Sequence, residues 1–135
     1  MALVDASLDR RVIHGFGPVR ITLAGTVQSG DPVKYDSGFK LAANTSGAPA
    51  ILVAGESGVS GDIITAFVLA VVELTHTAAN VPTQGQLIAV QDDGTYGPAG
   101  SGLQDIGYVV EIDSDNLHSR ALVSGFVPEI DTAGT

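Results

Sequence analysis

The chain of 135 residues has no cysteine and no tryptophan, and only six basic residues stand against fifteen acidic ones. Without cysteine there is no disulfide framework, no thiolate nucleophile and no cysteine-bound zinc site. The formal net charge of −9 disfavours binding to nucleic acid or to an anionic membrane, because like charges repel. We therefore expect neither nucleic acid nor membrane among the partners.

The chain has no long apolar run, and we expect neither a membrane-spanning helix nor a signal peptide. The most apolar stretch, 63–74, has twelve residues, which is well short of the roughly 20 that a membrane-spanning helix needs. The N-terminus carries Asp5 early and lacks the apolar core of a signal peptide. With 44% apolar and 16% charged residues, a chain of this length is expected to fold as a single domain with its own core.

The few basic residues are concentrated near the N-terminus. Residues 1–40 hold five basic and four acidic side chains, a net charge of +1, whereas residues 41–135 hold Arg120 alone against eleven acids, a net charge of −10. Net charge keeps proteins soluble, and the asymmetry also suits an N-terminal segment that docks on an acidic partner. We divide the chain into an N-terminal arm (1–20), a β domain (21–127) and a C-terminal tail (128–135).

One sequence phrase occurs twice, in segments 30–42 and 85–99. Each copy has an opening glycine, an apolar segment, an Asp-X-Gly turn and an aromatic residue on the return. Aspartate and glycine tolerate the positive φ angles that reverse a strand. Each copy therefore predicts a β-hairpin.

The remaining segments also favour strands. Alternating or continuous apolar patterns predict strands over 19–24, 50–54, 106–112 and 117–127. Segment 63–75 is long enough for a helix, but its β-branched and aromatic residues favour a strand bent near Ala70, as one strand or two. A single helical turn is expected near Ala78.

The sequence has no amphipathic pattern for a helix longer than about two turns. We predict an all-β, compact small domain built of hairpins with little helix. The side chains predicted to face its core are Val33, Leu41, Ile51, Val53, Phe67, Val71, Ile88, Val90, Val109 and Leu122.

Motifs that carry chemistry are incomplete. Segment 55–58 begins like the Gly-X-Ser-X-Gly nucleophile elbow, but Val59 stands where the last glycine belongs. Asp113 and Asp115 have calcium-loop spacing, yet Leu117 occupies the next ligand position, so a β-turn is the better interpretation.

The three histidines, His14, His76 and His118, are far apart in sequence. A three-histidine zinc site could still assemble in space, although no ligand spacing supports one. We expect a protein that is not an enzyme, with no catalytic residues, no cofactor, no metal and no small-molecule substrate.

The order of sequence phrases resembles the small head decoration (capsid cement) proteins of tailed double-stranded-DNA bacteriophages. The resemblance covers residues 25–125, and the segment 97–102 and the tail after Pro128 depart from the family pattern. The phrases that carry it are Gly30-Asp31-Pro32-Val33, Lys40-Leu41-Ala42, Ala50-Ile51-Leu52-Val53, Asp62 to Glu73, Gly85-Gln86-Leu87 and Ile106-Gly107-Tyr108-Val109.

The resemblance implies a β-barrel or β-tulip-like fold and a homotrimer that binds the major capsid protein on the outer capsid surface. Such a protein stabilises the head; it is made in the host cytoplasm and ends in the virion. An N-terminal arm commonly completes the capsid contact in this family. The resemblance and the charge asymmetry together predict the capsid-binding residues Leu3, Val4, Leu8, Arg10, Arg11, Val12 and Ile13.

The alternative is a non-catalytic β-domain binding module of carbohydrate or adhesin type. Such modules usually present exposed tryptophan or tyrosine platforms. This chain offers only Tyr35, Tyr96 and Tyr108 for that purpose.

Overall fold

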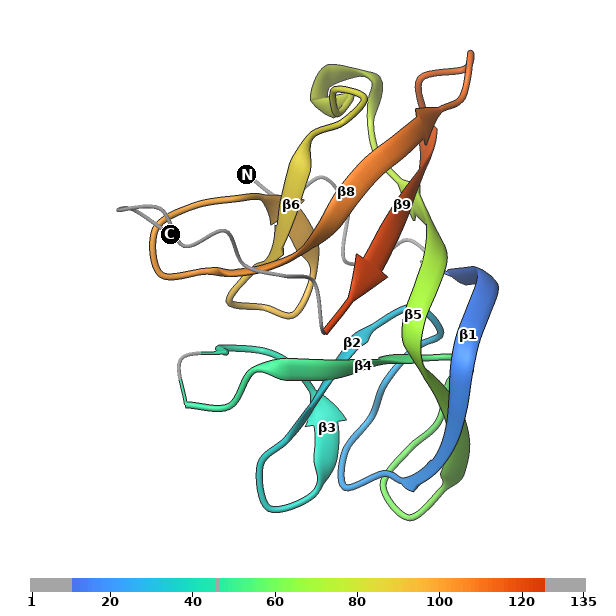
Figure 1. Ribbon diagram of the computed structural model, residues 1–135, viewed down its shortest axis with the longest axis vertical. Coiled ribbons are helices and arrows are strands. Elements are labelled where there is room, and N and C mark those ends of the chain that lie inside the picture. Colours follow the sequence, from blue (N-terminus) through green and yellow to red (C-terminus); the bar gives the residue numbers. More distant parts are fainter. Residues whose placement is uncertain (1–10, 46, 126–135) are drawn as a thin grey trace.

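A computed structural model describes residues 11–45 and 47–125 of the protein. Its strands are β1 (Arg11–Thr22), β2 (Pro32–Tyr35), β3 (Phe39–Leu41), β4 (Ala50–Ala54), β5 (Ile63–Thr75), β6 (Leu87–Val90), β7 (Tyr96–Pro98), β8 (Gln104–Ile112) and β9 (His118–Ser124). They form one nine-stranded sheet in the order β3-β2-β4-β5-β9-β8-β6-β7, with β1 paired to β5 (Figure 1).

The prediction of an all-β domain with little helix is confirmed. Within the described residues the only helical element is the 3₁₀ turn η1 (Ala78–Asn80), where one helical turn was expected. No helix in this part of the chain is long and apolar enough to cross a membrane. The sheet is not closed, so the barrel-like closure implied by the resemblance is not shown.

Both predicted hairpins are present, as β2–β3 and β6–β7. Their Asp-X-Gly turns place glycine at positive φ, 133° at Gly38 and 84° at Gly94. At Gly94 a Cβ would also lie 2.7 Å from the Leu41 side chain. Glycine is therefore required there twice, for the turn and for the close approach of one hairpin to the other.

Strand β5 is a single strand along its 13 residues and has neighbours on both sides. β1 pairs with it from Ile63 to Glu73. On the opposite side, β4 pairs at Ala66 and Phe67, and β9 takes over from Leu69 to Thr75. The length and the β-branched composition of this segment are explained by these three partners.

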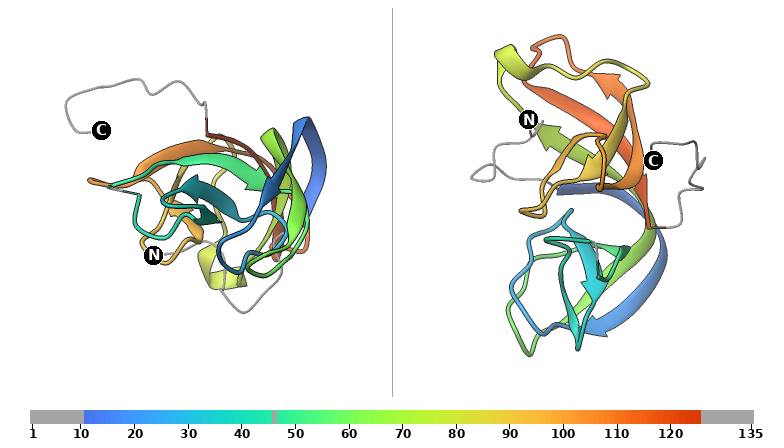
Figure 2. Two further views of the ribbon diagram at one scale, coloured as in Figure 1. Left: turned by 90° about the horizontal axis from the view of Figure 1, so that it is seen from below. Right: turned by 90° about the vertical axis from the view of Figure 1, so that its left-hand side faces the viewer.

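The buried side chains form two cores that share β5. Ala70, Val72 and Leu74 face a core with residues of β6 to β9, whereas Ile64 and Ala66 face a second core with residues of β1, β2 and β4. Figure 2 shows the two corresponding groups of strands, which β5 and β1 join. Alternate residues of β5 thus point inward, as a strand with one buried face requires.

Two polar contacts also join the two groups of strands, β2 to β4 and β6 to β9. The buried hydroxyl of Tyr96 donates to the carbonyl oxygen of Gly30 over 2.6 Å. The Gln104 amide accepts from the Ala50 backbone nitrogen at 2.7 Å and donates to the Ala50 carbonyl at 2.9 Å. The Gln104 side chain therefore satisfies both backbone groups of Ala50, as a neighbouring strand would.

The core prediction is confirmed in part. Val33, Val53, Ile88, Val90 and Val109 are fully buried. The side chains that are only half-buried are Leu41, Ile51, Phe67 and Val71. Leu122 is 37% exposed, so its placement in the core was wrong. It lies opposite Val71 on the outer side of the sheet, while Ala121 and Val123 face inward.

Residues 11–20, which the sequence analysis placed in an N-terminal arm, form most of β1. Gly15, Gly17 and Pro18 obscured this strand in the sequence. β1 pairs only with β5 in the sheet, and an edge strand tolerates proline because one side of its backbone needs no partner. The rest of the arm (1–10) and the predicted tail (128–135) lie outside the described residues.

Replacing Tyr96 by phenylalanine tests the link between the two groups of strands. Tyr96→Phe removes the donor to the buried Gly30 carbonyl and should lower the free energy of unfolding by about 1–3 kcal/mol. The control is Tyr35→Phe, because Tyr35 is 58% exposed and its hydroxyl should contribute less than about 0.5 kcal/mol. Urea unfolding measures both, and equal stability of the two variants would contradict the assigned role.

Candidate functional site

The outer side of β8, β9, β5 and β1 carries a row of neighbouring side chains. Tyr108 pairs with Leu122, Leu122 with Val71, and Val71 with His14. Residues directly opposite each other in antiparallel strands point to the same side of the sheet. The row therefore crosses four strands on one surface.

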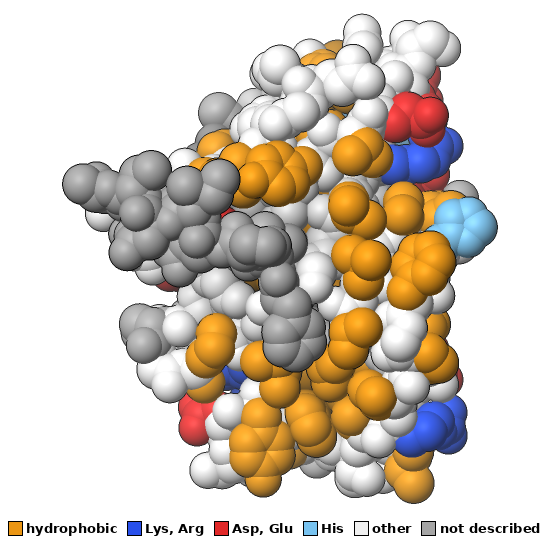
Figure 3. All heavy atoms as spheres, viewed as in Figure 1, with side chains coloured by type: hydrophobic (Ala, Val, Ile, Leu, Met, Phe, Trp, Pro, Cys, Tyr) orange, Lys and Arg blue, Asp and Glu red, His pale blue; other side chains and the backbone are white. Residues whose placement is uncertain are grey.

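A second row extends this surface, because Leu69 pairs with both Ser124 and Phe16. The exposed fractions are 53% for Phe16, 40% for Tyr108 and 37% for Leu122. We call the set Phe16, Leu69, Val71, Tyr108 and Leu122 the outer face. Figure 3 shows hydrophobic side chains gathered in a band over β9, β5 and β1. Contiguous exposed apolar side chains of this kind mark interaction surfaces more often than scattered ones do.

A charged row borders one end of the outer face. Arg120 pairs with Glu111 on β8 and with Glu73 on β5. Its Nη1 donates to Asp113 Oδ1 at 2.7 Å and to Glu111 Oε1, and its Nη2 lies 3.9 Å from Glu73 Oε2. Arg120 is thus the counter-ion of three carboxylates.

This arrangement has an electrostatic consequence. The hydrogen bond that the Arg120 guanidinium donates to Asp113, followed by the charges of Asp113 and Glu111, raises the pKa of Arg120. Arg120 is the only basic residue after position 40, so this end of the outer face remains acidic in sum. The charged row therefore places an excess of negative charge at one end of the outer face, in the direction of the strands.

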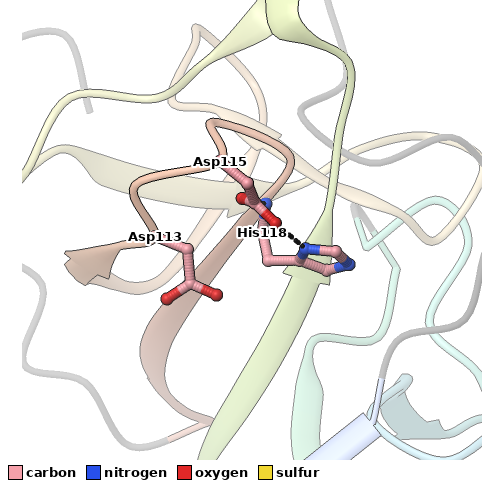
Figure 4. Close-up of side chains that lie close together, drawn as sticks. All are labelled: Asp113, Asp115 and His118. Atoms are coloured by element: carbon pink, nitrogen blue, oxygen red, sulfur yellow. Dashed lines mark hydrogen bonds and ion pairs between the residues drawn. The ribbon is translucent and has the colours of Figure 1, made fainter.

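The turn between β8 and β9 holds a further ionisable pair. Asp115 Oδ1 accepts from the backbone nitrogen of Leu117 at 2.8 Å, and Asp115 Oδ2 lies 2.9 Å from His118 Nδ1 (Figure 4). The bonds from Leu117 and His118 lower the pKa of Asp115. The bond to Asp115 raises the pKa of His118.

Asp113, Asp115 and His118 together form the one group of metal-ligand type among the described residues, with ligand atoms within 4.8 Å of one another. In the sequence the two aspartates and the histidine belong to no common ligand pattern, although the hairpin brings them together. Two carboxylates and an imidazole suit zinc or a similar ion. Here, however, Asp113 binds Arg120, and Asp115 binds His118. Ion pairing within the hairpin accounts for the geometry.

A cleft of about 250 Å³ lies elsewhere on the molecule, lined by Thr26, Val27, Gln28, Asp31, Leu41, Asp93 and Thr95. Asp31 Oδ2 accepts from the Gln28 backbone nitrogen at 2.9 Å. Asp93 Oδ1 accepts from the Thr95 hydroxyl at 2.6 Å and from its backbone nitrogen at 3.0 Å. Both carboxylates thus have roles in fixing turns, and the cleft is smaller than most ligand pockets.

The other sequence motifs have local structural roles. Ser57 Oγ accepts from the Ser29 backbone nitrogen at 3.0 Å, within a loop and not at a strand-to-helix elbow. His14 lies exposed on β1, whereas His76 is buried. Neither belongs to the metal-type group at the hairpin turn.

The predicted capsid-binding residues are only partly covered by the structure. Leu3, Val4, Leu8 and Arg10 lie outside the described residues. Arg11, Val12 and Ile13 begin β1. Val12 and Ile13 are half-buried, and Val12 packs against the core of β6 to β9. These three residues are therefore structural members of the sheet, which limits how far an arm could detach from it.

No protein-family model, no curated protein and no solved structure matches this chain. The outer face was missed in the sequence because Leu122 was placed in the core and Phe16 in an arm. His14 and Phe16 are two residues apart, the spacing of neighbours on one side of a strand. This spacing was the signal in the sequence that could have placed both on the outer face.

The Asp115–His118 pair generates a pH prediction. Asp115→Asn removes the carboxylate beside His118 and should lower the pKa of His118 toward the ordinary value of about 6.5. NMR titration of the imidazole measures this change. Asp92→Asn, in the turn of the β6–β7 hairpin, is the control and should leave the His118 titration unchanged.

The sign of the stability effect follows from the two pKa shifts. Because the pKa of His118 is raised in the folded state, its bond to Asp115 contributes fully to the free energy of unfolding below the pKa of His118 in the unfolded chain. This contribution is lost as the pH rises through the folded-state pKa. Because the pKa of Asp115 is lowered in the folded state, its bonds contribute to the free energy of unfolding above the pKa of Asp115 in the unfolded chain. That contribution is lost as the pH falls through the folded-state pKa. The pair should thus stabilise the hairpin most in mildly acidic solution. An unchanged His118 titration in Asp115→Asn would contradict the interaction between the two side chains.

Proposed function

We propose that this chain is a structural virion protein that binds the outer surface of a phage capsid as a trimer and stabilises the head. Its partner in this proposal is the major capsid protein. The protein acts by burying surface, and it needs neither a catalytic group nor a cofactor.

The observation that carries the proposal is the position of β1. This strand is an edge of the sheet and borders the outer face. It is also where the chain's only basic cluster enters the fold, since Arg10 immediately precedes β1, and Arg11 and Arg20 lie within it. A molecule with a charge of −10 beyond residue 40 would approach an acidic capsid through this edge.

Arg20 is a basic side chain on this edge whose contacts the structure describes. Its side chain is 64% exposed, lies 3.8 Å from Glu56 and donates to the Thr65 hydroxyl at 3.0 Å. Exposed ion pairs contribute about 0–1 kcal/mol each, so such arginines chiefly orient the encounter. Apolar residues such as Leu3, Val4 and Leu8 would supply most of the affinity, at about 25 cal/mol per Å² buried. A trimer multiplies each weak contact through avidity.

Removal of residues 2–10 tests the proposed contact and leaves β1 whole. We expect a folded protein that no longer co-sediments with heads of its phage prepared without the decoration protein. Arg10→Ala combined with Arg11→Ala should weaken binding and reduce its dependence on salt, because two cationic contacts are lost.

Removal of residues 128–135 is the matched control and should leave head binding intact. Circular dichroism would verify that each variant retains its β structure. If the protein lacking residues 2–10 saturates heads at wild-type affinity, the capsid contact is not made by this segment.

A carbohydrate- or adhesin-type binding module is the second candidate. It is favoured by Tyr35 and Tyr108, which are 58% and 40% exposed. Tyr96 is buried and is not available for such a role. Glycan binding that Tyr35→Ala or Tyr108→Ala abolishes would support this function, and head binding without glycan binding would refute it.

A further inference from the structure

We propose that the outer face is a contact surface between two copies of this chain, related by a twofold axis near Phe16 and Leu69. This interface goes beyond the capsid contact and the threefold contact of the proposed function. It is centred on Phe16 and Leu69, whereas the capsid contact is made mainly by residues 2–10, although both contacts involve β1.

The first argument concerns charge. Every copy carries a net charge of −9, so two copies attract each other only through a surface from which acidic groups are absent. The two rows that form the outer face meet this condition. They contain apolar side chains together with Ser124 and His14 and no carboxylate. A self-contact across these rows avoids the repulsion between the acidic bodies.

The charges that flank the outer face differ between its two ends, with an acidic excess at one end and a balanced ion pair at the other. At one end Glu73, Glu111 and Asp113 outnumber Arg120. At the other end Arg20 donates to the Thr65 hydroxyl on the same side of β5. Arg20 also lies 3.8 Å from Glu56, so its charge is balanced within one copy, and both side chains are exposed enough to re-pair across an interface. Figure 3 shows acidic and basic side chains together at the upper right and basic side chains at the lower right.

The register fixes where a twofold axis would have to pass. Along β5, Leu69 lies midway between Thr65, the partner of Arg20, and Glu73. Leu69 pairs with Phe16, the outer-face residue with the largest exposed fraction. A twofold axis that lies between the two sheets and runs across the strands at this pair brings Arg20 of each copy toward Glu73 of the other. It also places the exposed phenylalanines at the centre.

Sheets that pack face to face lie about 10 Å apart, with strands within about 30° of each other. Two outer faces in this arrangement would form a two-layer sandwich whose centre holds the aromatic side chains. Buried aromatic residues near the centre of an interface usually contribute most of the binding energy. Phe16 is therefore the residue whose replacement should matter most.

Analytical ultracentrifugation and native mass spectrometry of the full-length protein test the proposal without any capsid. We expect a concentration-dependent dimer, or an assembly with an even number of copies. Phe16→Lys should raise the dimer dissociation constant at least about tenfold. Val59→Lys is the matched control, because Val59 is 55% exposed and lies outside the outer face, and it should leave the constant unchanged.

A second variant tests the charge argument and does not depend on Phe16. Arg20→Glu should weaken the dimer and remove part of its sensitivity to salt, while circular dichroism remains that of the wild type. A protein that stays monomeric to high concentration would overturn the proposal. So would a dimer, or a pure trimer, whose affinity is the same in Phe16→Lys and in wild type.

Failure here can be told apart from failure of the proposed function. The association measurements contain no heads, so a monomer that still decorates heads refutes only the twofold contact. Conversely, a dimer that loses affinity in Phe16→Lys but never binds heads refutes only the capsid role.

Discussion

Strand β5 has to satisfy two cores with one set of inward side chains, and the rest of the fold is arranged around that requirement. Ala66 and Ala70 lie on either side of the change from one core to the other. Their small side chains suit the place where β4 ends its pairing with β5 and β9 begins. Larger residues, Ile64 and Leu74, fill the two cores farther along the strand, where more space is available.

The same transition is supported by an aromatic ring. Phe67 lies against Gly15 and Gly55, where an added Cβ would lie 2.4 Å and 2.6 Å from the ring. Glycine gives strands little side chain to pack, and a neighbouring aromatic residue compensates for the loss. Phe67 thus stabilises the point where β1, β5 and the loop after β4 meet, although it is only half-buried.

The sequence predicted those features that depend on local chemistry. Asp-X-Gly turns located both hairpins, and the β-branched residues of 63–75 identified β5. Strand β1 was missed from residue 11 because Gly15, Gly17 and Pro18 oppose strand formation locally, and its pairing with β5 overrides them. Burial of Leu122 was mispredicted because Ala121, Leu122 and Val123 form a continuous apolar run, which does not show which side of β9 faces the core. The outer face depends on long-range register, which no local pattern encodes.

The dependence of β5 on distant partners also has a consequence for synthesis. β1 is made first but cannot pair until β5 emerges, and β9, the other long partner of β5, is made last. During translation the apolar side chains of β1 and β5 therefore remain without the strand that completes the sheet. Folds dominated by such non-local pairs form slowly and expose strand edges meanwhile. After position 40 the chain adds acidic residues and no basic residue before Arg120, and this negative charge opposes aggregation in the interval.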